Sequence, residues 1–213
     1  MTDMNYIVFD LEWNIAGNKN KVSKAEQKKL PFEIIEIGAV KLDSEMQIVS
    51  SFNSYVRPKL YPVISRYVSR VTKRDQESLK LGKSFPDAAK DFHSFSKNGR
   101  PVFCSWSKSD PQVLIENLNY YDIELLNPLY CLDVQTLFAV VGEKVNSSTQ
   151  RSIEYALEYL NVTLDKPLHS ALNDACYTAK ILQAIWLELG DNSSSPSETL
   201  KEYLYQPSAK KRR

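Results

Sequence analysis

Cysteine is scarce in this sequence, and the three that it has, Cys104, Cys131 and Cys176, lie far apart without a Cys-x-x-Cys spacing. This pattern argues against a disulfide framework and against a zinc knuckle, and it predicts a reduced, intracellular setting. Long hydrophobic runs are also missing, because no stretch approaches the roughly 20 apolar residues that span a bilayer. The first residues lack the pattern of a secretory signal. We therefore expect a cytoplasmic protein with no membrane partner.

Net charge is nearly absent as well. The 27 Lys and Arg residues and the 26 Asp and Glu residues give a net charge of +1. No overall field therefore favours a polyanionic partner, and any contact with nucleic acid must come from local patches. A chain of 213 residues with 43% hydrophobic and 25% charged residues fits one globular domain. We expect a folded domain at 1–190 and a flexible basic tail at 191–213, which is linker-like and ends in AKKRR.

Two acids stand at the end of an apolar run near the start of the chain. Residues 6–14, YIVFDLEWN, are typical of a buried strand and contain Asp10 and Glu12. Side chains at i and i+2 share one face of a strand and lie about 6 to 7 Å apart. Unpaired carboxylates on a core strand are costly to desolvate, and a bound cation commonly compensates them. The pair predicts a metal site, with the emergence of the strand into solvent as the alternative.

The rest of the pattern indicates an α/β fold. The β-branched runs at 33–42 and 48–56 flank a turn and predict a hairpin, which extends the first strand into an antiparallel meander of three strands. Further short strands are expected at 101–106 and from residue 130. Helices are expected at 85–97, 110–119, 152–160 and 168–189. The basic stretches 15–30 and 57–83 are typical of solvated surface, with phosphate contact as the alternative.

Three more candidate residues lie farther along the chain. Asp110 follows the strand 101–106 and opens a helix, where open α/β sheets place their sites, with a helix N-cap or a first-turn acid as the alternative. His169 and Asp174 stand in HSALNDA, and inside one helix they would diverge by about 140°. If His169 instead precedes the helix, it can fold back over the face that carries Asp174. Such a site would have one acid to hold a metal and one imidazole to take a proton from an attacking water.

The order of these motifs resembles the DnaQ-like exonuclease superfamily, in its histidine-bearing DEDDh branch. The motifs are Asp-x-Glu on the first strand, Asp at a strand-to-helix turn, and His-x4-Asp at the last long helix. EIIEIGAVKL is similar to the second strand of that family, and Ser-Trp at 105–106 resembles the branch of histone-mRNA and small-RNA trimming exonucleases. The resemblance covers residues 6–189. It implies an RNase H-like fold, which is a mixed five-stranded sheet with an antiparallel meander of three strands followed by parallel strands, flanked by helices.

The resemblance also implies an activity. It implies a metal-dependent 3′-to-5′ exonuclease that releases nucleoside 5′-monophosphates from the 3′ end of single-stranded RNA or DNA, with RNA favoured by the branch. Asp10, Glu12 and Asp174 would hold two divalent ions, Mg²⁺ or Mn²⁺, and Asp110 would contribute directly or through water. His169 would be the general base. We expect a stand-alone nuclease and consider a homodimer as its assembly.

Four residues are candidate substrate contacts: Leu11, Trp13, Asn14 and Trp106. Members of the family commonly carry small or hydroxyl residues after Asp-x-Glu, so Trp13 and Asn14 depart from the pattern. Trp13 could stack on a terminal base or could simply pack inside the protein. The Leu-Thr-Gly-Ile segment of the family, which helps to hold the terminal nucleotide, has only a loose counterpart at 70–72.

Two other functions fit parts of this pattern. A haloacid-dehalogenase-like phosphatase also has two spaced acids at the end of a strand, but its chemistry needs Asp-x-Asp and leaves Glu12 and His169 without a role. A non-catalytic nucleic-acid-binding module with the exonuclease fold needs basic and aromatic surface, whereas clustered acids repel phosphate when no metal is bound. The retention of four acids and a histidine favours the enzyme.

Overall fold

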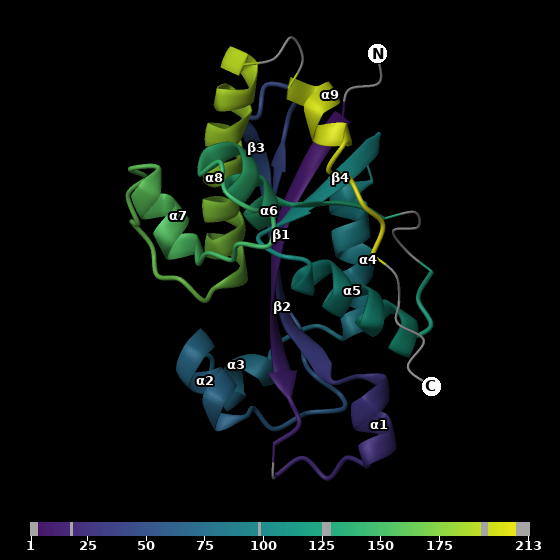
Figure 1. The fold of residues 1–213 in the computed structure, drawn as a ribbon. Helices are drawn as coiled ribbons and strands as arrows, with labels where there is room; N and C mark the ends of the chain where they lie inside the picture. The colour runs from purple at the N-terminus through teal and green to yellow at the C-terminus, as the bar shows by residue number, and fades with distance from the viewer. Residues whose placement is uncertain (1–3, 18, 98, 125–128, 193–195, 208–213) are drawn as a thin grey trace.

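One five-stranded sheet with helices on both faces forms the body of the protein (Figure 1). The computed structural model describes residues 4–17, 19–97, 99–124, 129–192 and 196–207. The strands are β1 (Met4–Ile15), β2 (Phe32–Leu42), β3 (Ile48–Tyr55), β4 (Arg100–Ser105) and β5 (Tyr130–Asp133), in the spatial order β3-β2-β1-β4-β5. Strands β1, β2 and β3 pair antiparallel, whereas β4 lies parallel to β1 and β5 lies parallel to β4. The predicted mixed sheet is confirmed.

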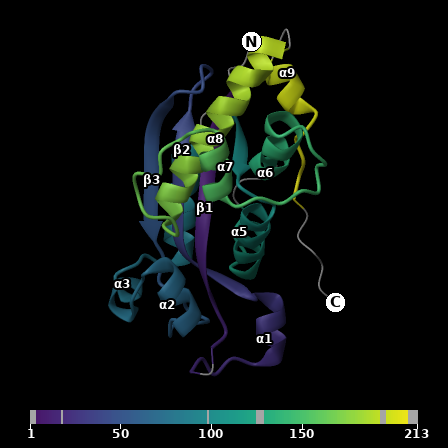
Figure 2. The same cartoon turned by 60° about the vertical axis from the view of Figure 1, so that its left-hand side comes forward.

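The helices cover the two faces of the sheet and one end of β1. They are α1 (Lys24–Lys29), α2 (Arg66–Thr72), α3 (Gln76–Lys80), α4 (Phe85–Ser96), α5 (Ser109–Tyr120), α6 (Val134–Leu137), the π-helical turn η1 (Phe138–Gly142), α7 (Ile153–Tyr159), α8 (Ala171–Asn192) and α9 (Pro196–Lys201). Helix α8 crosses one face with α6 and α7 beside it, and α4 and α5 cover the other (Figures 1 and 2). Helices α1, α2 and α3 gather at the C-terminal end of β1. In the part of the chain that the structure describes, no helix is long and apolar enough to cross a membrane.

Strand β1 divides the interior into two cores. Tyr6 and Val8 are buried in the core under α8, whereas Phe9 and Leu11 are buried in the core under α4 and α5. Successive side chains of a strand point to opposite faces. The even-numbered acids of β1 therefore lie on the side that α8 covers.

The C-terminal segment packs against the domain. Leu200 of α9 is buried in the core under α8. Beyond it, the N–H and the C=O of Tyr205 bond the backbone of Cys131 in β5, at 3.0 and 2.8 Å. Leu200 and Tyr205 therefore contact the domain, and the flexibility expected of the tail stays a prediction. The basic end at 209–213 lies outside the described residues, and the predicted boundary at residue 190 stays a prediction.

Candidate active site

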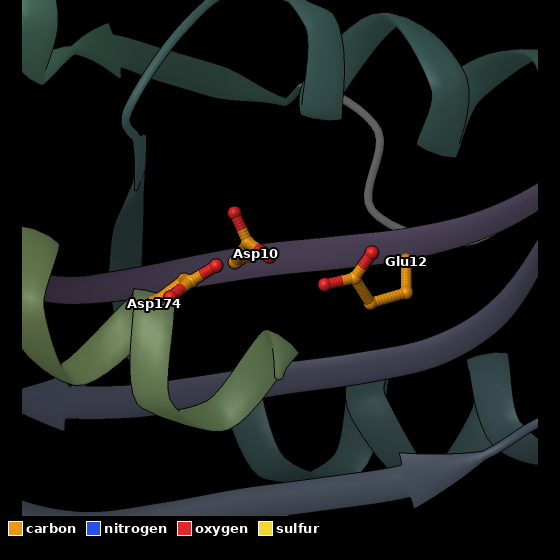
Figure 3. A group of neighbouring side chains, drawn as sticks. All are labelled: Asp10, Glu12 and Asp174. Atoms are coloured by element: carbon orange, nitrogen blue, oxygen red, sulfur yellow. The ribbon is translucent and has the colours of Figure 1, made fainter. Parts of the chain in front are cut away.

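Three carboxylates converge on the side of β1 that α8 covers. Asp10 and Glu12 come from β1, and Asp174 comes from the first turn of α8 (Figure 3). One carboxylate oxygen of each residue lies within 4.8 Å of the others. The i, i+2 spacing thus places the two acids of the strand together, and the helix brings the third acid to them. We call Asp10, Glu12 and Asp174 the acid cluster.

Gly38 of β2 allows α8 to come this close. It pairs with Asp10 in the antiparallel register, so its Cα hydrogens face the same side as the acids. A Cβ at Gly38 would lie 2.1 Å from backbone atoms of both Ala171 and Leu172. The first turn of α8 therefore rests on bare backbone, and it carries Asp174 over β1.

Asp110 is fixed to the backbone of β1. The pairing of β1 with β4 ends at Val8 and Cys104, which leaves the N–H of Leu11 free to donate to Oδ1 of Asp110 at 3.1 Å. Asp110 lies in the first turn of α5, but the N-cap residue is Lys108 and no side chain caps that helix. The buried carboxylate therefore binds the strand; Asp110 is not the N-cap of α5, but it is the first-turn acid that the alternative also allowed.

His169 lies just outside α8. The sequence predicts a helix from residue 168, but the helix begins at Ala171, and His169 adopts a left-handed conformation with a φ of 65°. Its backbone N–H donates to Oδ2 of Asp174 at 3.0 Å. The imidazole is exposed. Of the two arrangements that the sequence allows, the structure has the one in which His169 precedes the helix and lies beside Asp174.

Burial raises the pKa of Asp10, Glu12, Asp110 and Asp174, and repulsion between the carboxylates adds to the effect. The pKa of Asp10 lies well above its ordinary value because of burial and then because of the charges of Asp110, Asp174 and Glu12. Burial chiefly raises the pKa of Glu12 to about 8 and that of Asp110 to about 7. Burial also raises the pKa of Asp174 to about 6, while the hydrogen bond from His169 opposes this shift.

The acid cluster has the chemistry of a site for a hard divalent cation. All of its donors are carboxylate oxygens, which Mg²⁺ and Mn²⁺ prefer. Oδ1 of Asp174 is buried and has no hydrogen-bond partner among the described residues, so it is available as a ligand. An opposite charge beside the cluster would favour the ionised form of each acid. These residues therefore fit a metal ion.

A groove of about 540 Å³ opens beside the cluster. Its lining includes Trp106 at the end of β4, Arg151 in the loop before α7, and both His169 and Asp174. Trp106 is fixed there because its indole N–H donates to the carbonyl of Arg151 at 2.9 Å. The volume lies in the range of small-molecule sites, and the groove reaches the acid cluster at Asp174.

The other three substrate-contact candidates take packing or backbone positions. The side chain of Leu11 is 3% exposed and lies in the core under α4 and α5, so only its backbone serves the site. Trp13 packs on Phe32 with ring centroids 5.7 Å apart, which matches the packing alternative. Asn14 is fully buried, and its amide bonds three backbone groups in residues 61–65. Asn14 therefore holds that segment against β1, and its amide has no surface for a nucleotide.

Three further residues contribute to the site and were not predicted from the sequence. Gly38 lies under α8, Glu36 lies opposite Glu12, and Arg74 binds Glu36. The signal for Glu36 and Gly38 lies in EIIEIGAVKL, where both stand at alternate positions of an otherwise apolar strand. Arg74 is hidden in a basic stretch, and no sequence pattern distinguishes it from the cations around it.

The comparison with known families decides the relationship of this chain. The family model described as exonuclease (RNase_T) matches residues 7–182. The chain belongs to this exonuclease family. A curated relative, "Probable 3'-5' exonuclease KapD" of Bacillus subtilis (strain 168), is 29% identical over 124 residues, which are 58% of this chain and 57% of the relative. The aligned segment thus spans little more than half the length of that exonuclease.

Solved exonuclease structures share the fold. The nuclease domain of 3'hExo, described as a DEDDh family member bound to rAMP, is similar with a TM-score of 0.72 and 19% identity over 86% of this chain and 92% of that chain. A 3'-exonuclease described in recognition of the histone mRNA stem-loop is similar with a TM-score of 0.70 and 18% identity over 86% of this chain and 82% of that chain. Both support the RNase H-like sheet that the motif order implies.

Proposed function

We propose that this protein is a metal-dependent 3′-to-5′ exonuclease, which hydrolyses phosphodiester bonds from the 3′ end of single-stranded nucleic acid and releases nucleoside 5′-monophosphates. The observation that carries the proposal is the convergence of Asp10, Glu12 and Asp174, with Asp110 and His169 beside them, in a member of the exonuclease family. A binding module would gain nothing from buried acids that repel phosphate.

The acid cluster would hold two divalent ions, Mg²⁺ or Mn²⁺, with Asp110 contributing directly or through water. When bound, such ions lower the pKa of the attacking water and stabilise the charge on the leaving 3′ oxygen. The protein supplies the fixed geometry, since Asp110 is tied to Leu11 and Asp174 is tied to the backbone of His169. Ligands held in this way lose little entropy when a cation binds.

His169 would be the general base. Its backbone is anchored at Asp174 while its imidazole stays exposed at the groove, so a ring nitrogen can reach a water beside the cluster and accept its proton. Imidazole is the side chain that most often serves as a general base.

The groove beside the cluster would receive the 3′-terminal part of the substrate. RNA is the favoured substrate, and two observations support this choice. The similar structures include one described with rAMP and one described with histone mRNA. Ser105 and Trp106 carry the resemblance to the branch that trims RNA.

The test uses 5′-labelled single-stranded RNA and DNA of the same base sequence, with Mg²⁺, Mn²⁺ or EDTA. We expect a ladder that shortens from the 3′ end, release of mononucleotides, a faster reaction on RNA, and no reaction in EDTA. Asp10→Asn should abolish the ladder, and His169→Ala should slow it by roughly 100-fold or more. His93→Ala is the matched control, because His93 lies on α4 at the other face of the sheet.

The binding-module alternative predicts a different result. It predicts no cleavage under any condition and nucleic-acid binding that survives Asp10→Asn. Faster cleavage of DNA than of RNA would keep the exonuclease and overturn its proposed sugar preference.

A further inference from the structure

A fourth acid on the sheet, Glu36 of β2, is buried beside the cluster. It is fully buried and pairs with Glu12 in the antiparallel register, so the two side chains share the face that α8 covers. Its charge acts on all three members of the acid cluster and raises the pKa of each of them. A β-bulge follows at once, because Trp13 pairs with Ile34. Bulges commonly lie next to active sites, where they re-aim side chains.

Glu36 binds an arginine from the loop between α2 and α3. Nε and Nη2 of Arg74 both donate to Oε2 of Glu36, at 3.1 and 2.8 Å. The guanidinium also lies over the ring of Tyr55, 4.6 Å from its centroid. Oε1 of Glu36 is buried without a hydrogen-bond partner in the part of the chain that the structure describes. The arginine thus concentrates its bonds on one oxygen of one acid.

The backbone of Arg74 is fixed by hydrogen bonds of its own, independent of those of its side chain. It follows α2, where Lys73 adopts a left-handed conformation with a φ of 57°. The N–H of Arg74 donates to Oγ1 of Thr72 at 3.2 Å, and its carbonyl accepts the hydroxyl of Ser69 at 2.7 Å. The cation is therefore presented to the site from a fixed position.

Arg74 has two acids within electrostatic reach. Its charge lowers the pKa of Glu12, and the charge of Glu12 in turn raises the pKa of Arg74. A guanidinium that bonded Glu12 would occupy the oxygens that a divalent ion needs, because arginine binds carboxylates through two N–H groups. In the structure, however, both of these bonds go to Glu36.

We propose that Glu36 is a positioning residue of the metal centre, which holds Arg74 by two hydrogen bonds and thereby keeps Glu12 free to bind a divalent ion. The inference rests on the proposed function, which makes Glu12 a ligand. Arg74 in turn neutralises Glu36, since an unpaired buried carboxylate beside three others would be costly. Glu36 and Arg74 thus neutralise each other, and no carboxylate oxygen of Glu12 is used for this pair.

The two members of the pair therefore have opposite predicted effects on metal affinity. Glu36→Gln keeps the shape of the side chain but weakens its hold on Arg74, which can then turn to Glu12 and compete with the ion. Arg74→Met removes the competitor and leaves an additional negative charge, so it should not weaken metal binding. An ion pair with a merely structural role would give two variants of lower stability and unchanged metal affinity.

The experiment is a calorimetric titration of the full chain with Mn²⁺. We expect Glu36→Gln to lower the apparent affinity by roughly tenfold, the usual effect of removing a partner behind a metal ligand. The double variant Glu36→Gln/Arg74→Met should return to the wild-type affinity within about twofold, the usual error of such a cycle. Glu143→Gln is the matched control, because it breaks another arginine–glutamate pair, with Arg151 at 2.9 Å, and should leave the affinity unchanged.

Three results would overturn the inference. They are wild-type affinity in folded Glu36→Gln, an unrestored double variant, and a loss of affinity in Arg74→Met. If Glu36→Gln fails to fold by circular dichroism, Glu36→Asp takes its place, because its shorter side chain also loosens the two hydrogen bonds to Arg74 and should lower the Mn²⁺ affinity only if the inference is right. Failure of the proposed function is a separate outcome, in which the wild-type protein itself neither binds Mn²⁺ nor cleaves in its presence.

Discussion

Two buried acidic sites of opposite character lie a few residues apart on the same pair of strands. At Glu33 of β2, the carboxylate accepts the backbone N–H groups of residues 59–61 and the hydroxyl of Tyr121, at 2.6 to 2.9 Å. In the acid cluster the carboxylates lie beside one another, Asp174 accepts one backbone N–H, from His169, and burial and repulsion raise the pKa of Asp10, Glu12 and Asp174. The protein itself supplies the hydrogen bonds that Glu33 needs, whereas it does not do so for the acid cluster.

This difference separates a structural acid from a functional one. Buried polar groups are normally paired, and a satisfied carboxylate such as Glu33 ties a loop to the sheet. The acid cluster costs stability in the metal-free protein, so the sequence retains it for something other than folding. A divalent cation is the partner that would convert this cost into binding energy. Because Glu12 and Glu33 are both glutamates, a Glu→Gln substitution at each position compares the functional site with the structural one.

The largest expected effect is that of Glu12→Gln on activity. Loss of a metal ligand should lower kcat/KM by about 1000-fold, which corresponds to roughly 4 kcal/mol of transition-state stabilisation. The metal-free variant should be at least as stable as the wild type, because a repelled buried charge is gone. Exonuclease kinetics and urea unfolding in EDTA measure the two quantities. If Glu12→Gln retains a tenth of the wild-type activity, Glu12 is not a metal ligand of the catalytic site.

Glu33→Gln should do the reverse. It weakens four hydrogen bonds to a buried anion and should lower the free energy of unfolding by about 3 kcal/mol. Its kcat/KM per folded molecule should stay close to that of the wild type, because Glu33 serves the loop and not the acids. Urea unfolding and kinetics on the same samples check both statements. A loss of activity without a loss of stability would contradict the division between the two sites.

Gly38→Ala tests how α8 reaches the cluster. The new Cβ would meet the backbone of Ala171 and Leu172 at 2.1 Å, so the first turn of α8 must move away from β2. We expect a loss of about 2 kcal/mol in the free energy of unfolding, typical of overpacking, and weaker Mn²⁺ binding because Asp174 moves as well. Gly17→Ala is the control, since its Cβ would find ordinary contacts of 3.8 Å or more. Unchanged Mn²⁺ affinity in Gly38→Ala would show that the close approach is dispensable.

The acid cluster should also make the stability of the metal-free protein depend on pH. The folded pKa of Glu12, about 8, and that of Asp174, about 6, lie above their unfolded values, so the folded state holds more protons. The metal-free protein should therefore lose stability as the pH rises from about 5 to 8, by up to about 1.4 kcal/mol per pH unit for each proton. Urea unfolding in EDTA measures this slope. Glu12→Gln should flatten it, Glu33→Gln should leave it unchanged, and a rise of stability with pH would refute it.

Much of the fold can be predicted from local pattern. The apolar run in 6–14 identifies β1, because a strand with a core on each face is apolar on both of them, and the two β-branched runs identify the hairpin. The limits of α8 are less accessible to sequence reasoning. Residues 168–170 have the composition of a helix start, but α8 begins only at Ala171, and the N–H of His169 before it bonds Asp174.

The sequence by itself determined which chemical groups this protein has and on which face of a strand they lie. The i, i+2 spacing of Asp10 and Glu12 needs only the two-residue repeat of a strand, and the order of the motifs indicates the family. Only the tertiary structure decided which groups meet. The approach of α8 to Gly38 and the pairing of Glu36 with Arg74 join segments that are distant in the chain. Such contacts depend on close packing between elements, which no local periodicity records.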